Sequence, residues 1–318
     1  MPQETDRREF LKTGLITTAA LIASGPAFFG PNPSWALEPV QAGGSGGPDV
    51  VISHGRNPEV ITRAAVDALG GMKRFVKPGA KVVIKPNMSF ASGPQSAANT
   101  HPAVVSEVAK MCAESGASRI LVLDNVLHQP QDCLKLSKIA EHCQNIPKTG
   151  VHVIKGQRMF KEVKVENGVV IKSMAVASDL LDSDVLIAVP VGKSHVMSGV
   201  SLSMKGMMGL ILDRQTFHRQ KLHEAIVDMV TLLKPHLVVI DGTRILTTGG
   251  PGGPGTVVPL NLVIASPDMV AADAQMVALG TWYGKKVEPA QVKHIRIAAQ
   301  RGLGRMDVEK LDVKNITA

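Results

Sequence analysis

The chain contains very few aromatic residues: Phe, Trp and Tyr together make up 3% of its 318 residues. Proteins that bind single-stranded nucleic acid stack the bases on aromatic side chains. The lysines and arginines are also spread along the sequence and form no long basic run. The formal net charge of +8 therefore does not indicate nucleic-acid binding. A small anionic ligand is the partner that this basic charge favours.

Cysteine is scarce as well, with Cys112, Cys133 and Cys143 as its only occurrences. No two of them have the short spacing of a zinc or iron–sulfur motif, so we predict no metal site built from cysteine. Two states remain open for them. In an oxidising compartment one disulfide with a leftover thiol is possible, and three buried, small apolar side chains are the alternative.

The N-terminal segment lacks an apolar run long enough to form a stable membrane-spanning helix. Its apolar stretch, residues 14–29, is interrupted by Gly25 and Pro26. Before this stretch come Arg7-Arg8 and then Phe10-Leu11-Lys12. This pattern resembles the twin-arginine export signal of bacteria, which carries folded proteins across the membrane. An ordinary Sec signal peptide and a retained membrane anchor are the alternatives.

A small-x-small cleavage site, Ser34-Trp35-Ala36, follows the apolar stretch. We therefore expect a twin-arginine signal peptide at residues 1–36, cleaved near Ala36, and a Gly-rich linker at residues 37–48. Residues 49–318 are enough for a single α/β domain. The protein would be periplasmic, exported in the folded state by the twin-arginine translocase, without stable insertion in the membrane.

Short β-branched runs alternate with helical patterns after the linker. Most of the runs are apolar throughout, as in strands buried on both faces. They lie at residues 50–52, 81–84, 120–123, 185–189, 237–240 and 262–264. Helical patterns lie at residues 59–75, 103–115, 131–143, 222–233 and 269–279. This alternation predicts an α/β fold, a mainly parallel sheet with helices on both faces. Residues 162–165 and 169–172 flank Asn167-Gly168 and predict a β-hairpin insertion.

Polar side chains collect where the apolar runs end, which is where open α/β sheets bind ligands. Lys85 and Asn87 follow one run, and Lys193 and His195 follow another. A lysine that extends away from the sheet end is the alternative for Lys85. Lys193 and His195 would point to the same side of an extended segment as solvent-facing crevice residues. The lysine should lower the pKa of the histidine and keep it available as a base or a metal ligand.

Further candidates lie in the C-terminal half. Lys205 follows a serine-rich turn suited to anions, and Arg214 and His218 are four residues apart, on one helix face or on a surface connector. The glycine-rich run that includes Gly249 and Gly250 indicates a flap, a close backbone approach or a simple loop. Two acids are also candidates. Asp241 directly follows a strand, and Asp273, within a helix, is either site-facing or paired and buried.

Several short motifs appear in a fixed order: Lys85-Pro86-Asn87, Asn99-Thr100-His101-Pro102, Pro190-x-x-Lys193-x-His195, Ser203-x-Lys205-x-x-x-Gly209, Gly249-Gly250-Pro251, Ser266-x-Asp268-x-Val270-Ala271-x-Asp273 and Gly302-Leu303-Gly304. As a set they resemble the family called domain of unknown function 362. Members of that family are often fused to a ferredoxin-like iron–sulfur module, and this chain has no four-cysteine run. Lys205-Gly206 stands where members commonly have Lys-Asn. The resemblance implies a shared site without naming a reaction.

The leading hypothesis is an enzyme that acts on a small carboxylate or phosphate. Lys193 and Lys205 would hold the anion, His195 would move a proton, and Asp241 or Asp273 would orient the histidine. The other substrate-binding candidates are Lys85, Asn87, Arg214, His218, Gly249 and Gly250. A non-catalytic protein that binds an anion or a cofactor is the second hypothesis. A metal-binding or redox accessory protein is the third, since methionines close to His195 could bind Cu(I) or form a pliable pocket wall. No cofactor is identified.

Overall fold

The computed structural model describes residues 47–318. The predicted signal peptide at residues 1–36 and nearly all of the predicted linker lie outside the described residues, so both stay predictions. Across the part of the chain that is described, no helix combines the length and the apolar character needed to cross a membrane.

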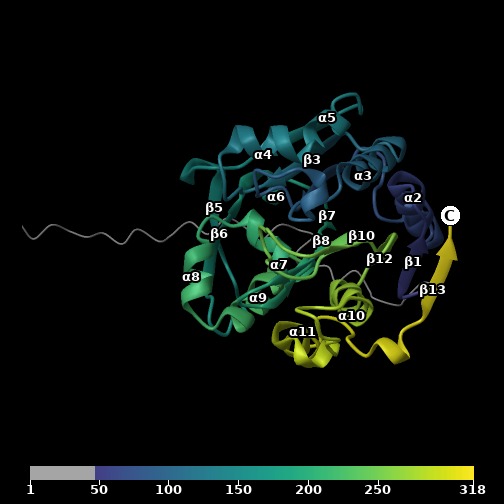
Figure 1. The fold of residues 1–318 in the computed structure, drawn as a ribbon. Coiled ribbons are helices and arrows are strands. Elements are labelled where there is room, and N and C mark those ends of the chain that lie inside the picture. Colours follow the sequence, from purple (N-terminus) through teal and green to yellow (C-terminus); the bar gives the residue numbers. More distant parts are fainter. Residues whose placement is uncertain (1–46) are drawn as a thin grey trace, which may run out of the picture.

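A large mixed sheet forms the centre of the molecule (Figure 1). Its main path runs β13-β1-β12-β10-β7-β2-β3-β4. Off this path, β8 and β11 pair with β10, and β9 pairs with β8. The strands of this sheet are β1 (Val50–His54), β2 (Lys81–Pro86), β3 (Arg119–Asp124), β4 (Thr149–Val153), β7 (Val185–Val189), β8 (Val191–His195), β9 (Gly199–Ser201), β10 (Leu237–Leu246), β11 (Val257–Val258), β12 (Leu262–Ser266) and β13 (Val313–Thr317). Most neighbouring strands are parallel, and β12 runs antiparallel to both of its neighbours. The predicted α/β class is therefore confirmed.

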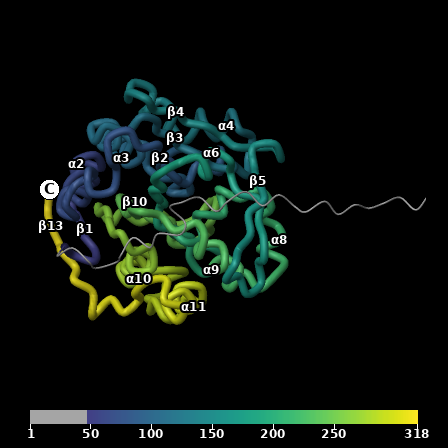
Figure 2. The backbone as a smooth tube through the Cα atoms, turned by 180° about the vertical axis from the view of Figure 1, so that it is seen from behind, coloured from purple at the N-terminus to yellow at the C-terminus, as the bar shows by residue number. Residues whose placement is uncertain are grey.

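Helices cover both faces of this sheet. They are α2 (Pro58–Ala68), α3 (Pro102–Glu114), α4 (Pro130–Ser137), α5 (Ile139–Cys143), α6 (Ser178–Leu181), α7 (Ser203–Gly206), α8 (Arg214–Arg219), α9 (Leu222–Leu232), α10 (Met269–Leu279) and α11 (Lys293–Gln300). In Figure 2, α2 and α3 lie on the opposite side of the sheet from α10 and α11.

Alternating residues of the central strands separate the two hydrophobic cores. Val82 and Ile84 of β2 pack with residues of α2 and α3, whereas Val83 between them packs with residues of α9 and α10. Because successive side chains of a strand point to opposite faces, a strand covered on both sides must be apolar at every position. This requirement explains the continuous apolar runs in the sequence.

The predicted hairpin insertion is present, but its second strand is shifted. β5 (Phe160–Lys164) pairs antiparallel with β6 (Ser173–Ala177) in a separate two-stranded sheet. Residues 169–172 do not form the second strand, because the carboxylate of Asp228 accepts hydrogen bonds from the backbone N–H groups of Val170 and Ile171 at 2.6 and 2.9 Å. Those donors are unavailable for strand pairing, so the connection between β5 and β6 is longer than the tight turn predicted at Asn167-Gly168.

All three cysteines are buried and free, which excludes the disulfide alternative in this structure. Burial raises the pKa of the Cys112 thiol and, to about 12, that of Cys143. These thiols are therefore unreactive core residues rather than nucleophiles.

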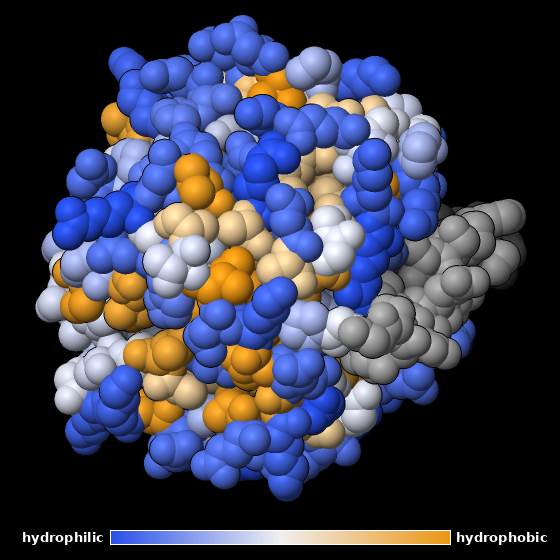
Figure 3. All heavy atoms as spheres, turned by 90° about the vertical axis from the view of Figure 1, so that its right-hand side faces the viewer, coloured by the Kyte–Doolittle hydropathy of each residue, from blue (hydrophilic) through white to orange (hydrophobic). Residues whose placement is uncertain are grey.

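The exposed edge of the sheet at β13 carries polar side chains. Figure 3 views the molecule from the side on which β13 lies in Figure 1, and polar side chains cover much of this face with apolar ones interspersed. Lys314 and Asn315 of β13 point to solvent. Charged and polar residues at an edge strand oppose pairing with a second sheet.

Candidate functional site

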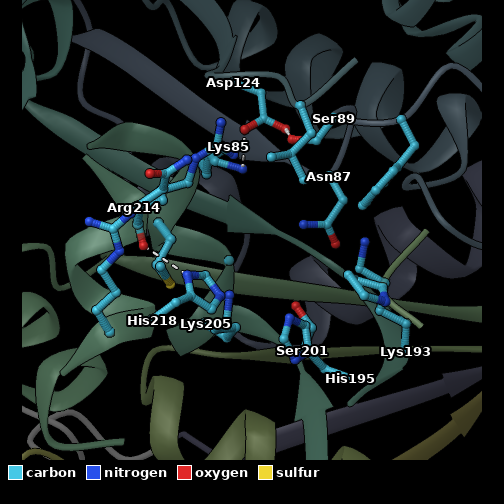
Figure 4. Close-up of a pocket in the computed structure, with 18 residues that line it drawn as sticks. Lys85, Asn87, Ser89, Asp124, Lys193, His195, Ser201, Lys205, Arg214 and His218 are labelled. Atoms are coloured by element: carbon cyan, nitrogen blue, oxygen red, sulfur yellow. Dashed lines mark hydrogen bonds and ion pairs between the residues drawn. The ribbon is translucent and has the colours of Figure 1, made fainter. Parts of the chain in front are cut away.

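A cavity of about 480 Å³ opens at the carboxyl ends of β2 and β3 (Figure 4). β8, β9, α7 and α8 complete its wall. Seven of the residues expected from the sequence lie together here: Lys85, Asn87, Lys193, His195, Lys205, Arg214 and His218. Four others, Asp241, Asp273, Gly249 and Gly250, are not among the lining residues. We call this cavity the cationic pocket, because Lys85, Lys193, Lys205, Arg214 and Arg219 line it and Asp124 is its only carboxylate.

Lys85 does not extend into solvent; it is buried at the end of β2 and forms an ion pair. Its Nζ lies 3.1 Å from Oδ1 of Asp124, and the two side chains are 2% and 1% exposed. The other carboxylate oxygen of Asp124 accepts hydrogen bonds from Met88 N–H and Ser89 Oγ at 3.0 and 2.9 Å. A Cβ on Gly209 would collide with both members of the pair, so a larger residue there would displace their side chains. Asp124 was not among the candidate site residues, although its position directly after the apolar run at residues 120–123 could have identified it.

Asn87 links the pocket wall to the next strand. Its Oδ1 accepts a hydrogen bond from the Val191 N–H at 3.0 Å, and its own backbone N–H binds Thr100 Oγ1. An amide whose oxygen is occupied in this way presents its NH₂ group, a donor, to the cavity.

Lys193 and His195 are buried, which corrects the expectation of solvent-facing crevice residues. They lie on β8, which pairs with β10 on one side and β9 on the other. Lys193 donates a 2.6 Å hydrogen bond to the Ala98 carbonyl and lies 4.9 Å from the centroid of the Phe90 ring. Burial lowers the pKa of Lys193 to about 7, and the neighbouring Lys85 and Lys205 act in the same direction.

Lys205 enters the pocket from α7 and is 8% exposed. Burial lowers its pKa to about 7, together with repulsion from Arg214 and Lys85. The start of α7 is held by Asp273, whose carboxylate accepts hydrogen bonds from the Ser203 and Met204 N–H groups at 2.8 and 3.0 Å. Asp273 is thus paired and buried, the second of the two alternatives for it, and positions the segment that carries Lys205.

Arg214 and His218 lie on the pocket-facing side of α8, as their spacing of four residues suggested. One Nη of Arg214 donates a 3.3 Å hydrogen bond to the Val126 carbonyl. Desolvation lowers the pKa values of both side chains. Asp213 accepts a 3.0 Å hydrogen bond from the Thr216 N–H and so caps the N-terminus of α8, which helps to orient the helix that carries both side chains.

The two pocket histidines have opposite hydrogen-bonding states. Nδ1 of His195 accepts hydrogen bonds from the Met197 and Ser198 N–H groups at 3.1 and 3.3 Å, so the proton of the neutral ring lies on Nε2. Nδ1 of His218 lies 2.7 Å from the Arg214 carbonyl and must donate to it, so its Nε2 carries a lone pair. The rings are stacked with centroids 6.2 Å apart.

Both rings are held neutral. Burial, followed by repulsion from Lys205 and His218, lowers the pKa of His195 to about 3. Lys193 contributes to this shift in the expected direction, but less than burial does. The pocket therefore offers one imidazole N–H donor and one imidazole lone pair.

Asp241 lies outside the pocket and cannot orient His195. Its carboxylate pairs with Arg244, and it accepts hydrogen bonds from Thr243 and from the His101 N–H at 2.7 Å. The sequence placed it correctly at a strand end, but an arginine three residues later neutralises it. The acid ties β10 to the start of α3 instead.

The glycine-rich loop packs against β8 next to the pocket. Gly249 has a φ of 68°, a conformation that favours glycine. Gly250 N–H donates a 3.1 Å hydrogen bond to Ser194 Oγ, and a Cβ on Gly250 would collide with the Ser194 carbonyl. Of this loop, Pro251 lines the pocket. The close-approach interpretation is therefore the one that the contacts support.

Within residues 47–318, no group of three or more His, Cys, Asp or Glu side chains is arranged to hold a metal ion. Met204, Met207 and Met208 belong to the hydrophobic core, and Met208 also lines the pocket wall. Carboxylate or phosphate oxygens are the ligand atoms that fit a wall rich in cations and N–H donors.

Comparison with known proteins places these residues in a family context. The sequence model described as "Domain of unknown function (DUF362)" matches residues 82–278. Thylakoid-associated protein sll1697 of Synechocystis sp. is 26% identical over 254 residues, which are 76% of this chain and 74% of that protein.

Two solved structures are similar at low identity. The lactate racemase apoprotein of Thermoanaerobacterium thermosaccharolyticum has a TM-score of 0.46 at 11% identity, over 72% of this chain and 57% of that one. A Thermotoga maritima protein has a TM-score of 0.45 at 12% identity, over 78% and 60%. This chain spans less than two thirds of the length of each.

Proposed function

We propose that this chain, which belongs to the family described as domain of unknown function (DUF362), binds a small organic carboxylate or phosphate in the cationic pocket and acts on it as an enzyme. The observation that carries the proposal is the imbalance of charge: five cationic side chains face one carboxylate. Lys85 alone is paired with that carboxylate. An anionic ligand would supply the missing negative charge.

Burial makes this imbalance energetically significant. Opposite charges at an exposed surface attract each other by only about 0–1 kcal/mol. Lys193 and Lys205 are buried, and in a partly desolvated site the same attraction is several times stronger. A ligand that neutralises them also removes the repulsion that lowers their pKa values. Binding should therefore be selective for anions and should weaken as salt screens the pocket mouth.

The two histidines supply complementary groups for catalysis. Nε2 of His218 has a lone pair and can accept a proton from a bound substrate, whereas Nε2–H of His195 can donate a hydrogen bond to an oxygen on which charge develops. We therefore assign the base to His218. His195, to which the sequence had suggested proton transfer, becomes the fixed donor, because protonating its Nδ1 would break two backbone hydrogen bonds.

Calorimetric titration with citrate, succinate and phosphate tests binding. The wild type should bind at least one of them, and Lys205→Gln and Arg214→Gln should lower the affinity roughly tenfold or more, equivalent to about 1.4 kcal/mol. Lys110→Gln is the matched control, since Lys110 is an exposed lysine on α3. Equal weak binding by all four proteins would end the proposal. Turnover assays on any ligand that binds then distinguish an enzyme from a non-catalytic binding protein.

We also propose that the protein reaches the periplasm in the folded state through the twin-arginine translocase. Arg7-Arg8 before an interrupted apolar stretch supports this proposal. Changing both residues to lysine should leave the protein in the cytoplasm on cell fractionation. An undiminished periplasmic amount of the double variant would favour the Sec route instead.

A further inference from the structure

Lys205 differs from the other buried cations of the pocket in having no partner. Lys85 pairs with Asp124, Lys193 donates to the Ala98 carbonyl, and Arg214 donates to the Val126 carbonyl. Across residues 47–318, the Lys205 amine forms neither a hydrogen bond nor an ion pair. The side chain is largely buried and lines the cavity, so a molecule bound in the cavity is the partner that this amine could meet.

Two neighbouring cations act on this amine. Lys85 and Arg214 repel the protonated form of Lys205, and burial adds to the effect, which lowers its pKa to about 7. Close to half of the Lys205 side chains are then neutral at pH 7. For an exposed lysine of ordinary pKa the neutral fraction is on the order of a thousandfold smaller. Desolvation and an adjacent cation are the two features that activate lysine nucleophiles in enzymes.

We propose that Lys205 is a nucleophilic amine that forms a Schiff base with the carbonyl group of an anionic carbonyl compound of the 2-oxo acid class. The inference rests on the proposed function, because the pocket must first bind the anionic group. Arg214 and Lys193 are the cations available to hold the carboxylate, since Lys85 is already paired. In Figure 4, Lys205 lies between the side of the pocket that carries Arg214 and the side that carries Lys193.

The histidines complete the chemistry of this step. The amine lone pair attacks the carbonyl carbon, a C–N bond forms, and the π electrons move to the oxygen, which Nε2–H of His195 stabilises by a hydrogen bond. Nε2 of His218 takes the two protons of the nitrogen one after the other and delivers each to the oxygen. The first gives the hydroxyl group of the carbinolamine, and the second lets that group depart as water when the C=N bond forms. One amine and one carbonyl thus give one imine and one water, with no change of oxidation state and no further reactant.

Reductive trapping tests the assignment directly. The full-length protein is incubated at pH 7 with pyruvate, 2-oxoglutarate or glyoxylate and cyanoborohydride, and the adducts are located by peptide mass spectrometry. At least one acid should label Lys205, at a rate on the order of a hundredfold or more above that of exposed lysines such as Lys110. Acetone, a carbonyl compound without an anionic group, should label Lys205 more slowly than the 2-oxo acids do, because the cations of the pocket do not hold it next to the amine.

Variants separate the nucleophile from the charge. Lys205→Arg keeps a positive charge but forms no imine, so it should lose the adduct and still bind 2-oxo acids in the calorimeter. Lys110→Arg should retain the Lys205 adduct. Because the site is mapped in the wild type itself, the test does not depend on how well Lys205→Arg folds.

The outcomes also distinguish this inference from the proposed function. Anion binding without any rapid adduct would overturn the Schiff base and leave the anion pocket standing. A rapid adduct on Lys193 instead of Lys205 would overturn the choice of nucleophile. If no acid binds and none labels the protein, both proposals fail together.

Discussion

The buried charged residues of this protein fall into two groups that differ in how many hydrogen-bond and ion-pair partners they have. Away from the pocket, buried carboxylates have several partners each. Asp228 accepts hydrogen bonds from two backbone N–H groups and forms a 2.7 Å ion pair with Arg301. Asp273 accepts hydrogen bonds from two backbone N–H groups. In the pocket, Lys193 has one backbone acceptor, the Ala98 carbonyl, and the Lys205 amine forms neither a hydrogen bond nor an ion pair within residues 47–318. Burying a charge without a partner opposes folding. The partners of the two acids account for their burial, whereas Lys205 has none, which supports the ligand site proposed above.

The largest expected effect is a loss of stability when one of the buried, partnered acids is removed. Asp228→Ala leaves Arg301 and the Val170 and Ile171 N–H groups without their acceptor, so it should lower the free energy of unfolding by about 3–5 kcal/mol. Denaturant titration measures the loss. Asp307→Ala, which removes an exposed ion pair with Lys310, should change stability by less than about 0.5 kcal/mol. A similar small effect for both variants would mean that the buried acid is not structural.

A change in the pocket should act in the opposite direction. Lys205→Met removes a buried cation that has no partner and replaces it with an apolar side chain of similar length. We expect it to raise the free energy of unfolding by about 0.5–2 kcal/mol while anion binding is lost. Thermal denaturation and calorimetry on the same preparation check both parts. A destabilised Lys205→Met would show that Lys205 contributes to folding and would remove the contrast between the two groups.

The smallest effect concerns pH. The pKa of Lys205 is lowered from its ordinary value to about 7, so between pH 7 and 10.5 the unfolded chain binds a proton that the folded chain does not. Stability must then rise with pH in this window. From pH 7 to 8, the wild type should gain about 1 kcal/mol relative to Lys205→Met. Urea titrations of both proteins at the two pH values give this difference, and parallel pH profiles would contradict the lowered pKa.

Much of the fold could be predicted because fully buried strands have a strong signature. β2, β3, β7 and β12 contain runs of apolar, mostly β-branched residues, and each lies where such a run predicted it. β8 was missed because Gly192, Lys193, Ser194 and His195 have the composition of a loop. This segment becomes a strand because β10 and β9 provide backbone partners on its two sides. Those partners come from other parts of the chain and leave no mark within the segment.

The sequence predicted most of the residues that line the pocket, but not the partners of each residue. Position at a strand end identified Lys85, Asn87, Lys193 and His195, because the carboxyl ends of parallel strands meet at one edge of the sheet. The same rule selected Asp241, which the structure pairs with Arg244 outside the pocket. Strand ends show which residues reach the edge, but not which of them are already paired.

Apolar periodicity and strand ends are local properties of the chain, so they are enough to predict the α/β class, the covered sheet and the positions at which cations reach its edge. Contacts between distant segments set which charges stay unpaired and which ring nitrogen of each histidine carries the proton. Asp124 meets Lys85 across two strands, and the tautomers follow from the hydrogen-bond partners of Nδ1, a backbone carbonyl for His218 and two backbone N–H groups for His195. These contacts depend on how the folded backbone places its groups in space, and local patterns in the sequence do not predict that placement.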